Sequence, residues 1–372
     1  PCPEADPLFL PVATKKGLFV YDLSGGKITL TGRHFLGDNL SLTGSDPRDG
    51  TWYAFQDLGH FGVKVQRSED RGATWTEVGV PTYPKQAEGE QETTPDGKPF
   101  VWSLKRVWSF AVGAPSQPGR LWCGTIPGGL FRSDDRGATW QLCDGLWRHP
   151  TRSKWFGGGA DLPGIHSVCI DPRDPRVLRV AVSCAGVWTS RDDGTTWTLE
   201  GKGLRAAFMP PEQAYDQLSQ DPHCMVQSPT QPDRLWIQHH NGIFRSDDGT
   251  TWTELTDVPP SVFGFAVAVH PKDGDTAWFV PAIKDERRYP VDGKVVVTRT
   301  RNGGKSWEVL RKGLPQEDAY DLTYRHGLDV AGDGETLAFG STTGSLWVSR
   351  DGGDSWETVS AHLPPIHSVR FA

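Results

Sequence analysis

The chain is built from short apolar runs separated by turn-forming residues. Three of these runs open with Gly and continue with an apolar or aromatic pair, at residues 129–131, 186–188 and 242–244. Turn signals rich in Asp, Ser and Pro lie upstream of the last two runs, at residues 171–175 and 228–232. Alternating apolar positions interrupted by Gly and Pro predict short antiparallel β-strands joined by tight turns.

A pattern of the form Ser-x-Asp-x-Gly-x-Thr-Trp recurs along the chain, with three well-formed copies, one conservative, one looser and one shortened copy. The Trp residues that end the six copies are Trp75, Trp140, Trp197, Trp252, Trp307 and Trp356. They are spaced by 65, 57, 55, 55 and 49 residues. A repeat of this length is typical of a four-stranded propeller blade with its turns.

The residue types of the pattern suit a hairpin turn, which we call the repeat turn. We expect its Ser and Asp side chains to accept hydrogen bonds from nearby backbone N–H groups. The Gly supplies a positive φ, and the Trp has a large apolar surface that can pack between neighbouring sheets. Each copy therefore predicts the junction of the last two strands of one blade.

The N-terminal part predicts a seventh blade that has no repeat turn. Its apolar runs at residues 8–13 and 17–21 lack an inner strand. Residues 365–369 supply one, because Pro-Ile-His-Ser-Val there resembles Gly-Ile-His-Ser-Val at residues 164–168. Pairing the two ends of the chain would close a ring and leave no exposed sheet edge. We therefore predict a single all-β domain over residues 1–372, a seven-bladed β-propeller.

The repeat turn resembles the Asp box of BNR-repeat proteins. Residues 124–133, 155–161 and 238–242 are also similar to a group of bacterial BNR-repeat, exo-α-sialidase-like proteins. The resemblance implies a propeller with glycosyl-hydrolase-like activity and with its Asp boxes on the face away from the active site. Sialidases carry a Phe/Tyr-Arg-Ile-Pro motif near the N-terminus, whereas residues 12–17 read Val-Ala-Thr-Lys-Lys-Gly. True sialidase activity is therefore not expected.

Composition and charge narrow the class of partner. The 372 residues include 43 Gly, 29 Pro and 16 Trp, which fits turns and aromatic packing rather than a helical bundle. The chain has 39 Lys and Arg against 46 Asp and Glu, a net charge of −7, so nucleic acid is not an expected partner. No apolar run is long enough to span a membrane. We expect a soluble monomer.

The cysteines and the first residues of the chain indicate in which cellular compartment we expect the protein. The six cysteines, Cys2 among them, are far apart and have no CxxC spacing, so we interpret them mostly as small buried hydrophobes. The first residues have no basic and apolar signal-peptide pattern. These observations favour the cytoplasm, with a periplasmic or secreted location as the alternative if a signal peptide was removed.

One face of the ring is expected to carry the functional site. The repeat turns and the turns between the first two strands of each blade should share the other face. The longest connections run over residues 76–106, 141–164 and 198–222 and should form walls around a central mouth. Long connections of this kind are typical of binding loops.

Histidines are concentrated at positions expected to face this mouth. Six of the eleven lie at strand starts or turns there: His60, His166, His223, His240, His326 and His367. We predict His166, His223 and His367 as ligands of zinc, copper or iron, with Cys184, Asp161 or Glu212 completing the shell. Two alternatives stay open. The histidines can be structural and bond a carbonyl of the next blade, or they can serve acid–base chemistry.

Other residues are candidates for substrate contact. Trp108 can stack on a sugar ring, and Arg325 and Arg106 can hold a carboxylate. His240 and His60 are further substrate-binding candidates. The alternative for the aromatic residue is packing between blades, and for the cations it is a solvated rim.

The catalytic candidates are two carboxylates and a phenol, namely Glu212, Asp161 and Tyr320. The charged loop at residues 284–289 is interpreted as a self-paired surface segment. These features predict a hydrolase or lyase for a small polar ligand, a carbohydrate or an organic acid, with metal assistance left open. The alternative is a non-catalytic propeller that binds a ligand or a protein on a rigid surface.

Overall fold

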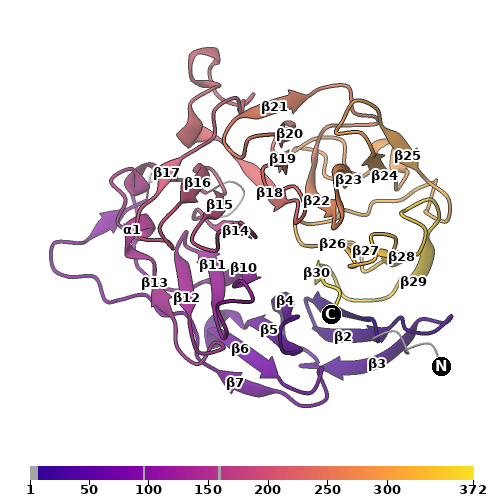
Figure 1. Ribbon diagram of the computed structural model, residues 1–372, viewed down its shortest axis with the longest axis horizontal. Coiled ribbons are helices and arrows are strands. Elements are labelled where there is room, and N and C mark those ends of the chain that lie inside the picture. Colours follow the sequence, from indigo (N-terminus) through magenta and orange to yellow (C-terminus); the bar gives the residue numbers. More distant parts are fainter. Residues whose placement is uncertain (1–6, 95–96, 158–160) are drawn as a thin grey trace.

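The computed structural model describes residues 7–94, 97–157 and 161–372. Cys2 and part of the segment 155–161 lie outside the described residues. Seven four-stranded antiparallel sheets surround a central axis (Figure 1). This arrangement confirms the predicted all-β, seven-bladed propeller. No helix among the described residues is long and apolar enough to cross a membrane.

The blades are numbered in chain order, and their strands are given from the axis outward. Blade 1 contains β30 (Ile366–Val369), β1 (Phe9–Thr14), β2 (Gly17–Asp22) and β3 (Thr29–His34). Blade 2 contains β4 (Leu40–Asp46), β5 (Thr51–Asp57), β6 (Val63–Ser68) and β7 (Thr76–Val78). Blade 3 contains β10 (Arg106–Val112), β11 (Leu121–Ile126), β12 (Leu130–Ser133) and β13 (Gln141–Leu142).

The other four blades follow the same order. Blade 4 contains β14 (Ile165–Ile170), β15 (Leu178–Val182), β16 (Gly186–Ser190) and β17 (Thr198–Leu199). Blade 5 contains β18 (Pro222–Gln227), β19 (Leu235–His239), β20 (Gly242–Ser246) and β21 (Trp252–Leu255). Blade 6 contains β22 (Gly264–His270), β23 (Asp273–Pro281), β24 (Val297–Thr300) and β25 (Glu308–Leu310). Blade 7 contains β26 (Leu328–Val330), β27 (Leu337–Gly340), β28 (Leu346–Ser349) and β29 (Glu357–Ser360).

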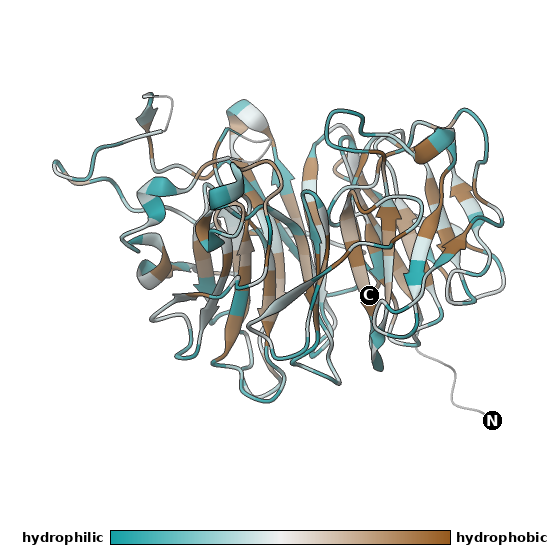
Figure 2. Cartoon of the chain, turned by 90° about the horizontal axis from the view of Figure 1, so that it is seen from above, coloured by the Kyte–Doolittle hydropathy of each residue, from teal (hydrophilic) through white to brown (hydrophobic). Residues whose placement is uncertain are grey.

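Short elements lie in the connections between these strands. The first long connection carries the ribbon β8 (Glu92–Thr93) and β9 (Pro99–Phe100), and the second carries α1 (Asp144–Trp147) and η2 (Arg152–Lys154). The remaining 3-10 turns are η1 (Gly59–Phe61), η3 (Pro211–Gln213), η4 (Gln217–Ser219) and η5 (Val291–Gly293). Figure 2 shows apolar strand segments in the body of the disc and hydrophilic segments mainly in its loops.

The ring closes through the two ends of the chain. Strand β30 pairs antiparallel with β1, with Val369 opposite Val12 and Ser368 opposite Ala13. The Phe9 N–H also donates to the Ala372 carbonyl at 3.0 Å. In Figure 1 the yellow C-terminal end lies beside the indigo first blade. The predicted closure by the C-terminal strand is therefore confirmed.

The repeat turns adopt the predicted hydrogen-bond pattern. In the first copy the Gly72 N–H donates to Ser68 Oγ at 2.8 Å, and Gly72 has a φ of 87°. The Thr74 N–H and hydroxyl donate to the two Asp70 carboxylate oxygens at 2.8 and 2.6 Å. These bonds hold the Asp70 carboxyl at a pKa of about 2, below its ordinary value. The side chains thus replace backbone partners that the tight turn cannot supply.

Two Trp residues of the repeat turns tie their blades to the preceding ones by a hydrogen bond. Trp140 Nε1 in blade 3 donates to the Gly79 carbonyl just after blade 2, at 2.9 Å. Trp252 Nε1 in blade 5 donates to the Glu200 carbonyl just after blade 4, at 3.2 Å. These two indole rings pack at the apolar seam between two sheets while their N–H groups keep a partner.

The turns and the long connections lie on opposite faces of the ring, as expected. In blade 3 the Arg136 N–H of the repeat turn donates to the Gly119 carbonyl of the first turn, at 3.0 Å. In blade 4 the Asp193 N–H donates to the Arg176 carbonyl in the same way, at 3.0 Å. The repeat turns therefore share a face with the turns between first and second strands. The long connections emerge at the opposite face.

Replacing Asp192 in the blade 4 repeat turn tests how much this side chain stabilises the fold. Asp192 accepts the Thr196 N–H at 2.8 Å and the Thr196 hydroxyl at 2.6 Å. Because Asp192→Ala removes both acceptors, we expect the free energy of unfolding in urea to fall by about 1–2 kcal/mol.

The matched control is Asp192→Asn, since the looser copy already carries Asn302 at this place. There the Asn302 side chain still accepts the Ser306 N–H at 2.9 Å. We expect this variant to lose less than about 0.5 kcal/mol. Equal losses for the two variants would contradict the role given to these bonds.

Candidate functional site

Two cavities lie along the propeller axis, one at each face. The upper cavity, of about 690 Å³, opens where the inner strands begin, on the face of the long connections. The lower cavity, of about 910 Å³, lies at the repeat-turn face and is mostly apolar. Two of its charged groups are engaged by the backbone: Asp329 accepts the Phe371 N–H at 2.8 Å, and Arg370 donates to the Val369 carbonyl at 2.7 Å. The smaller, upper cavity therefore carries the candidate chemistry.

Arg325 and His326 line both cavities and form a partition between them. His326 Nε2 donates to the carbonyl of His166 at 2.8 Å, which joins blade 7 to blade 4 across the axis. Burial lowers the pKa of His326 to about 3, so the ring is neutral at pH 7. The Arg325 guanidinium lies 4.6 Å from the Trp108 ring centre, a cation–π contact.

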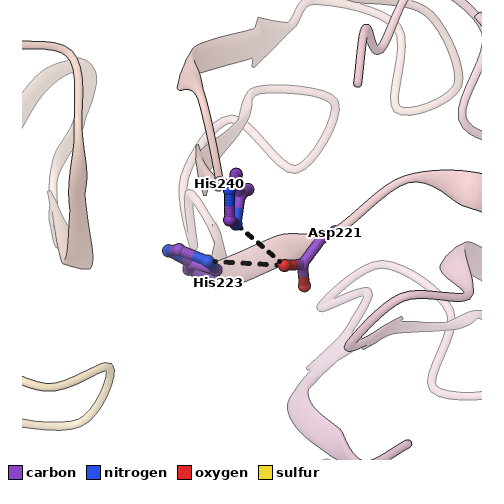
Figure 3. Close-up of side chains that lie close together, drawn as sticks. All are labelled: Asp221, His223 and His240. Atoms are coloured by element: carbon purple, nitrogen blue, oxygen red, sulfur yellow. Dashed lines mark hydrogen bonds and ion pairs between the residues drawn. The ribbon is translucent and has the colours of Figure 1, made fainter. Parts of the chain in front are cut away.

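A compact group of three side chains stands at the wall of the upper cavity (Figure 3). Asp221 precedes β18 and His223 lies within it, and a separation of two residues along an extended chain places both side chains on one side. His240 comes from the turn between β19 and β20. Asp221 Oδ2 lies 3.2 Å from His240 Nδ1 and 3.6 Å from His223 Nε2. We call these three residues the Asp–His cluster.

The electrostatics of the Asp–His cluster keep its carboxylate ionised. Burial alone would raise the pKa of Asp221, but its contacts with His223 and His240 and the Arg325 charge hold that pKa well below its ordinary value. Burial lowers the pKa of His223. It raises the pKa of the neighbouring Cys184 thiol, and the Asp221 charge adds to that effect. The cluster thus joins a buried anion to one imidazole, His223, whose basicity is lowered by burial.

The hydrogen bond of His223 to a backbone carbonyl determines which ring nitrogen carries the proton. His223 Nδ1 lies 2.7 Å from the Gly264 carbonyl of blade 6, an atom that can only accept. Nδ1 therefore carries the proton, and the neutral ring presents a lone pair at Nε2 toward Asp221. The ring is also stacked on Phe265, with centres 4.4 Å apart. Position and orientation of this imidazole are fixed from two sides.

All three long connections are predicted to form the cavity wall, and two of them contribute loop residues to it; the first contributes only its last residue, at the start of β10. Phe156 comes from the second connection and Phe208 from the third. The Phe208 ring contacts the His240 ring at 4.9 Å between centres. On the opposite side, Arg106 Nη2 pairs with Asp57 Oδ2 at 2.7 Å. Aromatic and charged groups thus both line the opening.

The structure brings several predicted site residues to the upper cavity. They are Arg106, Trp108, Cys184, His223, His240, Arg325, His326 and His367. His367 Nδ1 donates to the Leu40 carbonyl of the next blade at 2.8 Å, and His223 makes the equivalent bond. The structural role considered for repeated histidines is therefore present in both.

The predicted ligand set of His166, His223 and His367 does not form. Among the described residues, the compact group of possible metal ligands is Asp221, His223 and His240, whose ligand atoms all lie within 4.8 Å of one another. His166 borders the lower cavity and contacts Ser167 Oγ at 2.9 Å. The reason is geometric. Histidines at equivalent positions of different blades each point at the blade beside them, whereas Asp221, His223 and His240 come from one blade and its turn and therefore lie close together.

Four other candidates lie away from both cavities. Glu212 and Asp161 are exposed in the long connections, and His60 is exposed in η1. Tyr320 is 61% exposed and packs against Tyr289. They line neither cavity within the described part of the chain. Sequence position places a residue in a loop, but it does not fix where a loop of more than twenty residues folds.

Sequence reasoning missed several cavity residues, among them the charged residues Asp221, Asp285 and Arg288. The loop at residues 284–289 is self-paired as predicted, with Arg288 Nε donating to Asp285 Oδ1 at 3.0 Å, yet both residues also face the cavity. A signal for Asp221 was present in the sequence. It is the acid two residues before a histidine that starts an inner strand.

Comparisons with known proteins show which proteins have a similar sequence or fold. No known family model matches the chain. It is 26% identical over 254 residues to a probable oligoxyloglucan-reducing end-specific xyloglucanase of Neosartorya fischeri, a match that covers 64% of this chain. The matched part spans only 28% of that relative's length.

Solved structures show the same architecture. The GH74 xyloglucanase of Xanthomonas campestris superposes with a TM-score of 0.62 at 17% identity, covering 96% of this chain and 52% of that one. A periplasmic gluconolactonase of Pseudomonas aeruginosa superposes with a TM-score of 0.59 at 13% identity, covering 98% and 99%. These likenesses confirm the propeller and do not confirm the BNR-repeat, sialidase-like family.

Buried neutral histidines predict a pH-dependent stability. Burial lowers the pKa of both His326 and His239 to about 3, against an ordinary value of about 6.5. Below pH 6.5 the unfolded chain binds a proton at each of these imidazoles, whereas the folded chain does not. The free energy of unfolding is therefore unaffected by the titration of these histidines above pH 6.5, and it falls as the pH is lowered further. Between pH 7.5 and 5 we expect each to lower the free energy of unfolding by about 2 kcal/mol.

His326→Gln isolates one of these contributions. Gln retains a donor for the His166 carbonyl but does not titrate, so the fall in stability between pH 7.5 and 5 should shrink by about 2 kcal/mol in urea unfolding curves. His60→Gln, at an exposed site, is the control and should leave the fall unchanged. An unaltered fall in His326→Gln would show that this ring titrates normally.

Proposed function

We propose that the protein is a hydrolase for a small sugar-derived ester or lactone that carries a carboxylate and binds in the upper cavity. In this proposal the Asp–His cluster activates water, Arg325 holds the substrate carboxylate, and Trp108 contacts the sugar ring. The xyloglucanase and gluconolactonase names of the similar proteins support a carbohydrate substrate. The proposal concerns the cavity of this chain alone.

The observation that carries the proposal is the pairing of an ionised carboxylate with a free cation in one cavity. Asp221 is held in its charged form beside two imidazoles. The Nε atom of Arg325 is buried and has no hydrogen-bond partner among the described residues. A half-buried guanidinium with a buried, unused donor atom is a ready partner for an anion. The cavity therefore offers a base on one side and an anion holder on another.

The state of the cavity carboxyl groups favours an ester or lactone over a glycosidic bond. Glycoside cleavage uses a protonated carboxyl group to donate to the leaving oxygen. Asp221 is ionised, and Asp285 and Asp57 are paired with arginines Arg288 and Arg106. None of these three carboxylates is therefore placed to donate a proton to the leaving oxygen of a glycoside.

The proposed reaction consumes one water molecule. The cluster takes a proton from water, and the resulting hydroxide adds to the carbonyl carbon of the substrate. The bond between that carbon and the alcohol oxygen then breaks, and the proton passes to the leaving oxygen. The products are a carboxylate and an alcohol, or a single hydroxy acid from a lactone. The released proton of the new acid goes to solvent.

A substrate panel tests the proposal on the full chain. We expect turnover of glucaro-1,4-lactone, which carries a carboxylate, measured by proton release. His240→Gln should lower kcat at least about hundredfold, because it removes a base of the cluster. The exposed His60→Gln is the control. Turnover confined to nitrophenyl glycosides, or binding without turnover, would overturn the proposal and favour a glycosidase or a binding platform respectively.

Arg325→Met tests the anion holder. Met has a similar length and no charge, so KM for glucaro-1,4-lactone should rise at least about tenfold, equivalent to about 1.4 kcal/mol. The neutral glucono-1,5-lactone should show little change in KM. An equal rise for both lactones would show that Arg325 only supports the partition.

A further inference from the structure

We propose that the Asp–His cluster binds one divalent transition-metal ion of the zinc type through Asp221 Oδ2, His223 Nε2 and His240 Nδ1. The remaining coordination positions of the ion would face the upper cavity. Binding of the ion can be tested without any substrate. Its use in activating water rests on the proposed function.

The distances from the carboxylate oxygen to the two imidazole nitrogens are close to those of a metal shell, and the ligand atoms of the group all lie within 4.8 Å of one another. Tetrahedral ligands at 2.0–2.1 Å from zinc lie about 3.3 Å from one another. The carboxylate oxygen lies 3.2 Å from the His240 nitrogen and 3.6 Å from the His223 nitrogen. The two imidazole rings are steeply inclined, at 73°. A small movement of side chains would therefore bring all three atoms to bonding distance of one ion.

The proton positions leave a gap that a cation would fill. The Gly264 carbonyl takes the Nδ1 proton of His223, so a neutral His223 directs its Nε2 lone pair at the Asp221 oxygen. The 3.6 Å between His223 Nε2 and Asp221 Oδ2 is too long for a direct hydrogen bond, and a positive charge between the two atoms would stabilise both. A metal ion supplies that charge and bonds both atoms.

Each imidazole also has the outer partner that metal-binding histidines require. A ligating histidine donates its second ring nitrogen to a carbonyl or a carboxylate, which fixes its tautomer and orientation. His223 has the Gly264 carbonyl at 2.7 Å. His240 Nε2 faces Asp285 Oδ2 at 4.0 Å. The Asp285 contact would tighten when Nδ1 of His240 bonds the metal and its proton moves to Nε2.

The donor set selects the class of ion. Two imidazole nitrogens and one carboxylate suit zinc, iron(II) and their neighbours, whereas magnesium and calcium prefer oxygen donors alone. Three protein ligands leave a position for water, as in catalytic rather than structural sites. Arg325 borders the same cavity, so an anionic ligand could bind the ion and the guanidinium together.

The direct experiment is a titration of the chelator-treated full chain with zinc chloride by calorimetry. We expect one zinc ion per chain, and a cobalt(II)-substituted sample should show the visible absorption of a four- or five-coordinate site. His240→Gln and Asp221→Asn should weaken zinc binding at least about tenfold, and Asp285→Asn by about tenfold through His240. His367→Gln is the matched control, since this cavity histidine lies outside the cluster, and its zinc affinity should equal that of the parent chain.

Several results would overturn the proposal. They are the absence of saturable zinc binding, equal zinc affinity in the cluster variants, or imidazole nitrogen NMR shifts of a protonated His223 that zinc does not change. Because Asp221 is buried, thermal unfolding must first show that the Asp221→Asn variant is folded. If it is not folded, the cobalt spectrum and the NMR shifts of the parent chain test the proposal instead. Zinc binding without lactone turnover would overturn only the proposed function, and turnover by zinc-free protein would overturn only the metal's role.

Discussion

Antiparallel pairing between β30 and β1 is the interaction on which the rest of the structure depends. Each blade is a sheet whose two faces are both apolar, so it is stable only when a neighbour covers each face. An open ring would expose one face at each end and two strand edges. Closure by the C-terminal strand removes both, and it also fixes the distance of every inner strand from the axis. The cavities exist because of this constraint.

Closure alone would leave a continuous channel, and two residues of blade 7 divide it. His326 spans the axis to the carbonyl of His166, while Arg325 lies over Trp108 from blade 3. The partition puts a cation next to the buried carboxylate of Asp221 without a direct salt bridge between them. Such an arrangement is costly for folding unless a ligand or ion compensates the charges, which is typical of functional sites.

The Asp–His cluster shows how the propeller supplies both order and reactivity. The backbone of the next blade fixes His223 through Gly264, and the stacked Phe265 ring holds its plane. His240 is less confined, because it lies in a turn and touches the long-connection residue Phe208. A rigid ligand beside a more adaptable one suits a site that must admit a substrate. The fold is shared with proteins of different activity, so the chemistry depends on these side chains.

The amino-acid sequence alone is enough to predict the architecture. The spacing of the repeat turns, their Ser, Asp and Gly positions and the matching Ile-His-Ser segments predicted seven blades and their closure, because turn geometry and strand alternation are local properties. It also placed His223, His240, Arg325 and Trp108 at the right end of the ring. Three outcomes could be seen only in the folded chain: His166 borders the lower cavity, Glu212 and Asp161 are exposed to solvent, and Asp221 completes the cluster. Those outcomes depend on side-chain direction across the axis and on the paths of long loops, which contacts between distant segments fix and which no local pattern encodes.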